Sequence, residues 1–305
     1  MIRGSAWKAL VSNTVNDIQR NHTFAFAAGL AYYFVLSLFP SLILLAAVLV
    51  LLPIPDLFGR ILNTMSKVIP PDGMGLVRQI TATVISPNRG VLFSFGLIGV
   101  LWSVTSGFSA MIEALNVAYD VPETRPFWKI RAVALLMALG VGGLFMTAVG
   151  VQIVGPDFGR WLAHHLGLGP LLRIIWPYLR WGVTAGFTII AIVATYKVAP
   201  NVRQRLRQIL PGALFAAVCW ILLSFGLGVY FQNFAHFNKT YGTLGAAIAL
   251  LVWFDYTGLV ILVGASVNSQ LIQSQGDGRL ELKYQPRKAA AEEEPEISKG
   301  KDVAA

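Results

Sequence analysis

The sequence predicts an all-helical, polytopic membrane protein with six transmembrane helices and additional amphipathic helices at the membrane surface. Hydrophobic residues make up 55% of the 305 residues, whereas charged residues make up only 13%. The chain contains long runs without charge, each near or above the roughly 20 residues that a helix needs to cross the hydrocarbon core. Lysines and arginines gather in the short segments between these runs, as charges that determine topology do.

Residues 1–22 are expected to form an amphipathic helix on the cytoplasmic membrane surface. Apolar residues recur at helical spacing at Trp7, Val11, Val15 and Ile18, with the basic residues off that face. The apolar run that follows is about 30 residues long, which exceeds the core of a signal peptide. We therefore expect an uncleaved first transmembrane span.

The charge-free runs define the six spans of a transmembrane domain over residues 23–275. The spans are expected at about residues 25–52, 90–113, 132–156, 177–197, 211–233 and 243–271. Pro40 lies within the first span, where it removes one backbone hydrogen bond and is expected to kink the helix. Broken helices line binding sites in transporters, although a kink that serves only packing is the commoner case.

Two further segments lie outside the spans. Residues 56–86 show apolar residues at helical spacing on both sides of the sequence PPDG, which predicts an external helical hairpin. Residues 276–305 are polar and rich in charge, and we expect them to form a disordered cytoplasmic tail.

The distribution of positive charge predicts the orientation. Of the 24 lysines and arginines, 16 lie on the side of the N-terminus and 8 on the other side. Because cytoplasmic loops carry the excess of positive charge, both termini are expected in the cytoplasm. The net charge of +9 is spread over short loops, so no nucleic-acid partner is expected. Cys219 is the single cysteine, which excludes an intramolecular disulfide.

Three sequence elements are distinctive: FAAGLAYYFVLSLFPSLILL in the first span, the ALN-x-x-Y element from Ala114 to Tyr119, and the KTYG element from Lys239 to Gly242. With these elements the sequence resembles the YihY/BrkB family of bacterial inner-membrane proteins. The resemblance implies six spans in the cytoplasmic membrane. It implies no defined activity: the family is linked by name to serum resistance and envelope integrity, and was once labelled a tRNA-processing ribonuclease. Members commonly end the sixth span with Gly-Ala-Glu, whereas the third residue here is Ser266.

Asp255 is the most conspicuous candidate site residue, because it lies near the middle of the apolar stretch VWFDYTGLVILVGASVN. A carboxylate in hydrocarbon must be protonated, paired or hydrated, so such residues usually have a function. Ser266 lies 11 residues further on, almost three helical turns, and shares its face. The alternative is that Asp255 only joins neighbouring helices by hydrogen bonding.

The second span carries a stripe of small and polar residues that ends in a glutamate near the cytoplasmic end. It consists of Ser103, Ser106, Ala110 and Glu113. Two interpretations are open: a substrate path, or helix packing through small residues. Glu113 is also expected to be able to pair with Lys197 or Arg131 at the boundary, where Asn116 would cap or bridge.

Candidate contacts for an anion or a lipid headgroup lie near the external ends of the spans. They are Lys239, Asn238 and Tyr241 in the turn before the sixth span, and Arg180 near the start of the fourth. A lysine beside the free N–H groups of a helix start can hold a phosphate. The alternatives are a turn that is merely rigid, and an arginine that extends to the membrane interface.

The residue pattern does not favour an enzyme, a metal site or a cofactor. The four histidines are scattered at His22, His164, His165 and His236, whereas metal-dependent phosphodiesterases need clustered ligands. The sequence contains no Walker loop and no G-x-S-x-G element.

The sequence therefore favours a transporter-like protein that handles a lipid or another amphipathic, anionic envelope component without its own ATPase. Its expected partners are membrane lipids, and the sequence leaves the oligomeric state open. Two alternatives remain: a non-transporting structural envelope protein, and an ion-coupled solute transporter in which Asp255 or Glu113 would carry protons.

Overall fold

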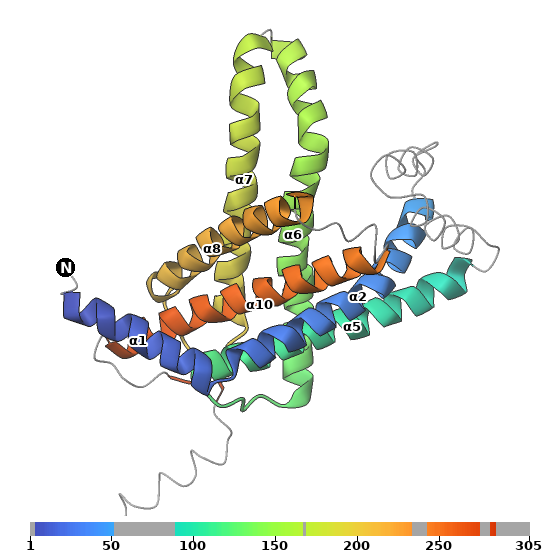
Figure 1. The fold of residues 1–305 in the computed structure, drawn as a ribbon. Coiled ribbons are helices and arrows are strands. Elements are labelled where there is room, and N and C mark those ends of the chain that lie inside the picture. The colour runs from blue at the N-terminus through green and yellow to red at the C-terminus, as the bar shows by residue number, and fades with distance from the viewer. Residues whose placement is uncertain (1–3, 52–88, 167–168, 234–242, 275–280, 285–305) are drawn as a thin grey trace, which may run out of the picture. The chain divides into compact units, whose positions relative to one another are not determined.

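A computed structural model describes residues 4–51, 89–166, 169–233, 243–274 and 281–284 (Figure 1). The described residues form helices α1 (Gly4–Arg20), α2 (Thr23–Leu51), α5 (Arg89–Ala118), α6 (Phe127–Leu166), α7 (Gly169–Val198), α8 (Leu206–Asn233) and α10 (Thr243–Ser274). The predicted all-helical fold is confirmed. The hairpin predicted at 56–86, the turn with Lys239, Asn238 and Tyr241, and most of the predicted tail lie outside the described residues.

Five helices in the described part are long and apolar enough to cross a membrane. The apolar stretches are Leu97–Ala118, Phe127–Gln152, Ile174–Val198, Leu206–Tyr230 and Ala247–Ser274. A shorter apolar stretch, Thr23–Ser37, lies in α2, where the first span was predicted. The described helices thus account approximately for the six predicted spans.

Helices α6 and α7 extend further than the spans predicted for them. The sequence placed these spans at 132–156 and 177–197, bounded by charged residues, but α6 runs over Phe127–Leu166 and α7 over Gly169–Val198. A charged residue at a membrane interface limits the apolar stretch without ending the helix, because the backbone hydrogen bonds continue into the aqueous region.

The described chain divides into two compact units. One unit comprises Met1–Phe24, Met111–Trp220 and Val260–Ala305, and the other comprises Ala25–Ala110 and Ile221–Leu259. Both units contain segments that are distant in sequence, because α5, α8 and α10 each contribute to both.

In the second of these units, close approaches at glycines bring α2 against α5 and α10. A methyl group on Gly258 would lie 3.5 Å from the backbone of Ala27, and one on Gly99 would lie 3.5 Å from the ring of Pro40. Pro40 is thus contained within α2 and packs against α5. Because small residues allow backbones to come together, these contacts are typical of helix packing in membranes.

In the first unit, α7, α8 and α10 meet at a still closer approach. A methyl group on Gly264 would lie 2.7 Å from the backbone oxygen of Gly212 and 2.8 Å from the side chain of Ala216. The hydroxyl of Tyr196, which is fully buried, donates to the carbonyl of Ile261 at 2.5 Å. Two glycines on facing helices therefore set the distance between α8 and α10.

Asn268, also fully buried, connects these helices by hydrogen bonds. Its Oδ1 accepts from the backbone N–H of Gly212 at 2.7 Å. Its Nδ2 donates to the carbonyl of Ile209 at 3.0 Å and to the hydroxyl of Tyr119 at 3.3 Å. Because both the N–H groups and the oxygen of this buried amide form hydrogen bonds, Asn268 fixes α10 against α8 and the end of α5.

Helix α1 lies within residues 1–22, where an amphipathic helix on the cytoplasmic membrane surface was predicted. Asp17, in its last turn, accepts a hydrogen bond from the side chain of Gln270 in α10. Val11 and Val15, on the predicted apolar face, are exposed. An apolar face that remains exposed outside the spans suits contact with a membrane surface.

Candidate functional site

The predicted site residues fall into both units. Asp255, Ser103 and Ser106 belong to the unit of residues 25–110 and 221–259, whereas Glu113, Asn116, Arg180 and Ser266 belong to the other. Asp255 is half-buried in α10 and forms no ion pair within the described part of the chain. Its role stays a prediction.

The serines are engaged by their own helices. Ser106 donates from Oγ to the carbonyl of Trp102 at 2.7 Å, and buried Ser266 donates to the carbonyl of Leu262 at 3.1 Å. A serine that bonds the carbonyl one turn back needs no other partner. The geometry of Ser106 is compatible with helix packing, one of the two interpretations of the stripe, and the role of the stripe stays a prediction.

The pairing that was considered for Glu113 does not form. Glu113 is exposed on α5 and makes no ion pair with Lys197 or Arg131 in the described structure. The ammonium of Lys197 instead donates to the carbonyl of Gln204. A different carboxylate, that of Glu123, lies at this boundary in the segment after α5 and pairs with Arg125.

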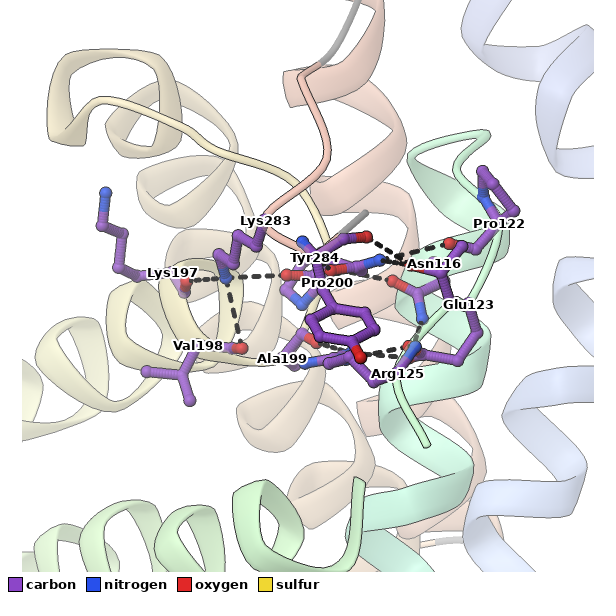
Figure 2. Close-up of polar contacts among 12 residues, drawn as sticks. Asn116, Pro122, Glu123, Arg125, Lys197, Val198, Ala199, Pro200, Lys283 and Tyr284 are labelled. Atoms are coloured by element: carbon purple, nitrogen blue, oxygen red, sulfur yellow. Dashed lines mark hydrogen bonds and ion pairs between the residues drawn. The ribbon is translucent and has the colours of Figure 1, made fainter. Parts of the chain in front are cut away.

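That boundary holds a cluster of polar side chains, which we call the boundary cluster. It consists of Asn116, Glu123, Thr124, Arg125, Asn201, Lys283 and Tyr284, and it joins the segment after α5, the segment between α7 and α8, and the segment after α10 (Figure 2). These segments do not form regular helices here, so their backbone groups need partners from side chains.

An ion pair lies at the centre of the boundary cluster. Figure 2 shows the side chains of Glu123 and Arg125 side by side, with Arg125 Nη2 at 2.6 Å and Nε at 2.9 Å from the two carboxylate oxygens. Nη2 also donates to the carbonyl of Ala199 at 2.8 Å. Burial alone would raise the pKa of Glu123, but the hydrogen bonds and charge of Arg125 and the hydrogen bond from Asn116 lower it below its ordinary value.

Two buried asparagines link the three segments. Asn116 donates to Glu123 Oε2 at 2.7 Å and accepts from the backbone N–H of Asn201 at 2.7 Å. Asn201 in turn donates to Thr124 Oγ1 at 2.8 Å and accepts from the backbone N–H of Tyr284 at 3.2 Å. Asn116 thus connects the segment after α5 with the segment between α7 and α8.

Lys283 fastens the segment after α10 to the end of α7. Its ammonium donates to the carbonyls of Lys197 at 2.6 Å, Val198 at 3.3 Å and Pro200 at 2.7 Å (Figure 2). A cation suits the C-terminal end of a helix, where carbonyls lack partners. Burial and the charges of Arg125 and Lys197 nevertheless lower the pKa of Lys283 to about 8. Residues 281–284 were expected in the disordered tail, but these contacts hold them against the end of α7.

Lys283→Met is expected to release residues 281–284 while leaving the helices folded, because it removes three hydrogen bonds and keeps most of the side-chain volume. Amide hydrogen exchange measures this release at two backbone N–H groups. That of Arg203 donates to the carbonyl of Glu281, and that of residue 283 donates to the carbonyl of Asn201. At both amides we expect exchange at least about tenfold faster, since charged hydrogen bonds contribute about 1.5 kcal/mol or more.

The control is Glu281→Gln. Glu281 pairs with Arg203 at 3.9 Å, with side chains 77% and 69% exposed, and exposed pairs contribute little. Equal exchange in the two variants would contradict the role assigned to Lys283.

A second feature is an open pocket of about 500 Å³ between α6 and α7, the two helices of the long hairpin in Figure 1. Its apolar lining includes Val151, Val154, Phe158, Trp176, Leu179 and Val183. Among the described lining residues, Arg180 is the one that carries a charge. The sequence had identified Arg180 as a candidate anion contact.

Glycines of α6 make room for the larger side chains of α7. A methyl group on Gly155 would lie 2.7 Å from Cδ of Arg180, and one on Gly159 would overlap the indole of Trp176. Trp176 Nε1 donates to the carbonyl of Gly155 at 2.7 Å. Arg180 Nε is buried and has no hydrogen-bond partner among the residues that the structure describes. The side chain therefore packs against Gly155 of α6 with an unused N–H group.

Sequence reasoning missed most of the boundary cluster and the pocket. Asn116 and Arg180 were identified, but Glu123, Arg125 and Lys283 were not. The available signal was the pair of loops VPETRP and APNVRQR, in which prolines break the helix beside buried polar residues.

Comparison with known proteins places the chain in a family. Residues 14–291 match the family described as "Virulence factor BrkB". The chain belongs to this family. It is also 35% identical over 245 residues to the ribonuclease-like protein YfkH of Bacillus subtilis (strain 168), covering 80% of this chain and 88% of that protein.

Other relatives are named UPF0761 membrane proteins. The chain is 27% identical over 261 residues to the UPF0761 membrane protein Smlt0865 of Stenotrophomonas maltophilia (strain K279a), covering 81% of this chain. It is 24% identical over 257 residues to the UPF0761 membrane protein XOO3417 of Xanthomonas oryzae pv. oryzae (strain MAFF 311018). The chain spans 57% of the length of each of these two relatives. No solved structure matches. The chain is an integral membrane protein of the BrkB/UPF0761 family.

Proposed function

We propose that this BrkB-family protein binds an anionic, amphipathic component of the cell envelope in the α6–α7 pocket and helps it to move within or leave the cytoplasmic membrane. The proposal includes no catalytic step and no ATP hydrolysis. One observation carries it: an apolar pocket that contains a single guanidinium with an unpaired, buried Nε.

The chemistry of Arg180 indicates the kind of ligand. A buried donor without a partner costs roughly 1–3 kcal/mol, more when the group is charged, so Arg180 Nε–H is unfavourable in the empty pocket. An anion would accept this hydrogen bond, and the apolar walls would contact the apolar part of the same molecule. A ligand with both parts is an amphiphile such as an anionic lipid.

The proposed location is the bacterial cytoplasmic membrane, with both termini in the cytoplasm. The excess of lysine and arginine on the N-terminal side supports this orientation. The boundary cluster would then lie at the cytoplasmic ends of the helices, and the turn between α6 and α7 on the opposite side.

Arg180→Met is expected to reduce the retention of anionic lipids relative to zwitterionic lipids by at least about tenfold, the equivalent of one charged hydrogen bond. Methionine preserves an apolar stem against Gly155 while removing the charge. The measurement is native mass spectrometry of lipids that remain bound after purification.

Arg160→Met is the matched control, because Arg160 is exposed on α6 and does not line the pocket. Retention of the same bulk lipids by the wild type and both variants would contradict lipid handling through this pocket. It would favour the structural role instead.

A further inference from the structure

The length of α6 indicates where the pocket lies with respect to a membrane. The helix has 40 residues, so it is about 60 Å long, twice the roughly 30 Å of the hydrocarbon core. Its apolar stretch begins at Phe127 and ends at Gln152. Gly155 and Phe158, which line the pocket, lie beyond that end. The pocket is therefore at the boundary of the membrane farthest from the start of α6.

In α7 the lining residues lie inside the apolar stretch Ile174–Val198, close to its first residue. Arg180 lies 18 residues before Val198, the end of the apolar stretch of α7, which corresponds to about 27 Å along the helix axis. Measured from the boundary cluster, Arg180 has thus nearly crossed a hydrocarbon core of about 30 Å.

Aromatic side chains support this placement. Trp161 on α6 and Tyr178 and Trp181 on α7 are exposed and lie within three residues along the chain of residues that line the pocket. Trp and Tyr are enriched at membrane–water interfaces, where an apolar ring and a polar edge both find a suitable environment. At the opposite end of α6, exposed Phe127 and Trp128 mark the other interface.

The charge of the pocket limits the headgroup. One guanidinium balances one negative charge, and a second charge on the ligand would remain unpaired among apolar walls, which is costly. The unpaired Nε belongs to the edge of the guanidinium that can hold two oxygens of a phosphate side by side. A phosphodiester has one charge and two such oxygens, whereas a phosphomonoester carries additional charge.

We infer that the pocket binds the phosphodiester headgroup of a lipid in the leaflet next to the α6–α7 turn, with the phosphate on Arg180 and an acyl or similar chain along Val151, Val154 and Leu179. This inference rests on the proposed function and adds to it the headgroup class and the leaflet. The polar remainder of the headgroup projects into water, because the described lining offers it few hydrogen-bonding side chains.

Gly155 provides a test that leaves the charge in place. A methyl group at this position would meet Cδ of Arg180 at 2.7 Å. Because that atom belongs to a flexible side chain, Gly155→Ala is expected to displace the guanidinium and not to unfold the hairpin. Gly143→Ala is the matched control on α6, since nothing lies within 4 Å of the added methyl.

The experiment uses full-length protein in nanodiscs of phosphatidylcholine with a minor fraction of either phosphatidylglycerol, a phosphodiester, or phosphatidic acid, a phosphomonoester. Native mass spectrometry is expected to show that the wild type and Gly143→Ala retain phosphatidylglycerol in preference to both other lipids. In Gly155→Ala this preference should fall by about tenfold. If Gly155→Ala does not fold, Arg180→Lys replaces it, because lysine keeps the charge without the paired N–H groups.

A second arm locates the headgroup. Phosphatidylglycerol with a photoreactive group on its glycerol is expected to crosslink to residues 147–158 and 176–183. Crosslinks near residues 127–137, or equal retention of phosphatidic acid, would overturn the inference while leaving Arg180-dependent lipid binding intact. Retention that is independent of Arg180 for every anionic lipid would contradict the proposed function itself.

Discussion

Gly212→Ala is expected to prevent stable assembly of α8 with α10, the largest effect that we predict for a single methyl group. The added carbon would overlap the backbone oxygen of Gly264 and lie 2.5 Å from the side-chain amide of Asn268. A backbone oxygen cannot rotate away as a side chain can. The helices would have to separate, at the expense of the buried hydrogen bond from Gly212 to Asn268. We expect a loss of about 3 kcal/mol or more in the free energy of unfolding.

The measurement is the unfolding temperature of purified protein in detergent, with the fraction of monodisperse protein as a second readout. Gly226→Ala, on the same helix, is the matched control because nothing lies within 4 Å of the new methyl. The control should unfold at the wild-type temperature or slightly above it, since alanine favours helix more than glycine does. Equal unfolding temperatures for the two variants would show that α8 and α10 do not approach as described.

The helices could be predicted from the sequence because the membrane imposes a simple rule. A span must lack charge over most of the thickness of the hydrocarbon, so α5 and α8 were located from uninterrupted apolar runs and α10 from a run that contains a single charged residue, Asp255. The same rule failed for the ends of α6 and α7. Both helices continue past the apolar stretch. Charged residues such as Arg160 and Arg173 therefore lie within these helices and do not mark where they end.

The candidate sites were less predictable, because they depend on contacts between distant segments. The boundary cluster joins Asn116 to Asn201, 85 residues apart, and Thr124 to Tyr284, 160 residues apart. No local pattern encodes such contacts. Arg180 was identified by its charge alone. Its place in an apolar pocket depends on how α6 and α7 are aligned, because this alignment brings Gly155 opposite Arg180.

Arg125→Met is expected to destabilise the protein by about 3 kcal/mol, because it breaks a largely buried ion pair and leaves the carboxylate of Glu123 without its main partner. The side chains of Arg125 and Glu123 are 7% and 23% exposed. Thermal unfolding in detergent measures the effect. Arg203→Met is the control: Arg203 pairs with Glu281 at 3.9 Å and the two side chains are 69% and 77% exposed, so we expect a change within about 0.5 kcal/mol.

The pH dependence separates the ion pair from simple loss of packing. In the wild type, the pKa of Glu123 is lower in the folded protein than its ordinary value, despite burial, because Arg125 and Asn116 stabilise the carboxylate. Its contribution to stability is therefore fully present above the ordinary carboxyl pKa of about 4.3 and is lost as the pH falls through the lower, folded pKa. Without Arg125, burial raises the pKa of Glu123. Protonation of Glu123 at lower pH then removes the unpaired charge and reduces the destabilisation of the variant.

The difference in unfolding temperature between the wild type and Arg125→Met should consequently narrow as the pH falls from 7 toward about 4. Adding Glu123→Gln to Arg125→Met should reduce the difference in unfolding temperature from the wild type at neutral pH as well. Removal of both charges leaves no unpaired carboxylate in the buried cluster. A difference that stays constant over this range, in the single and the double variant alike, would show that Arg125 acts only through its volume and its hydrogen bond to the carbonyl of Ala199.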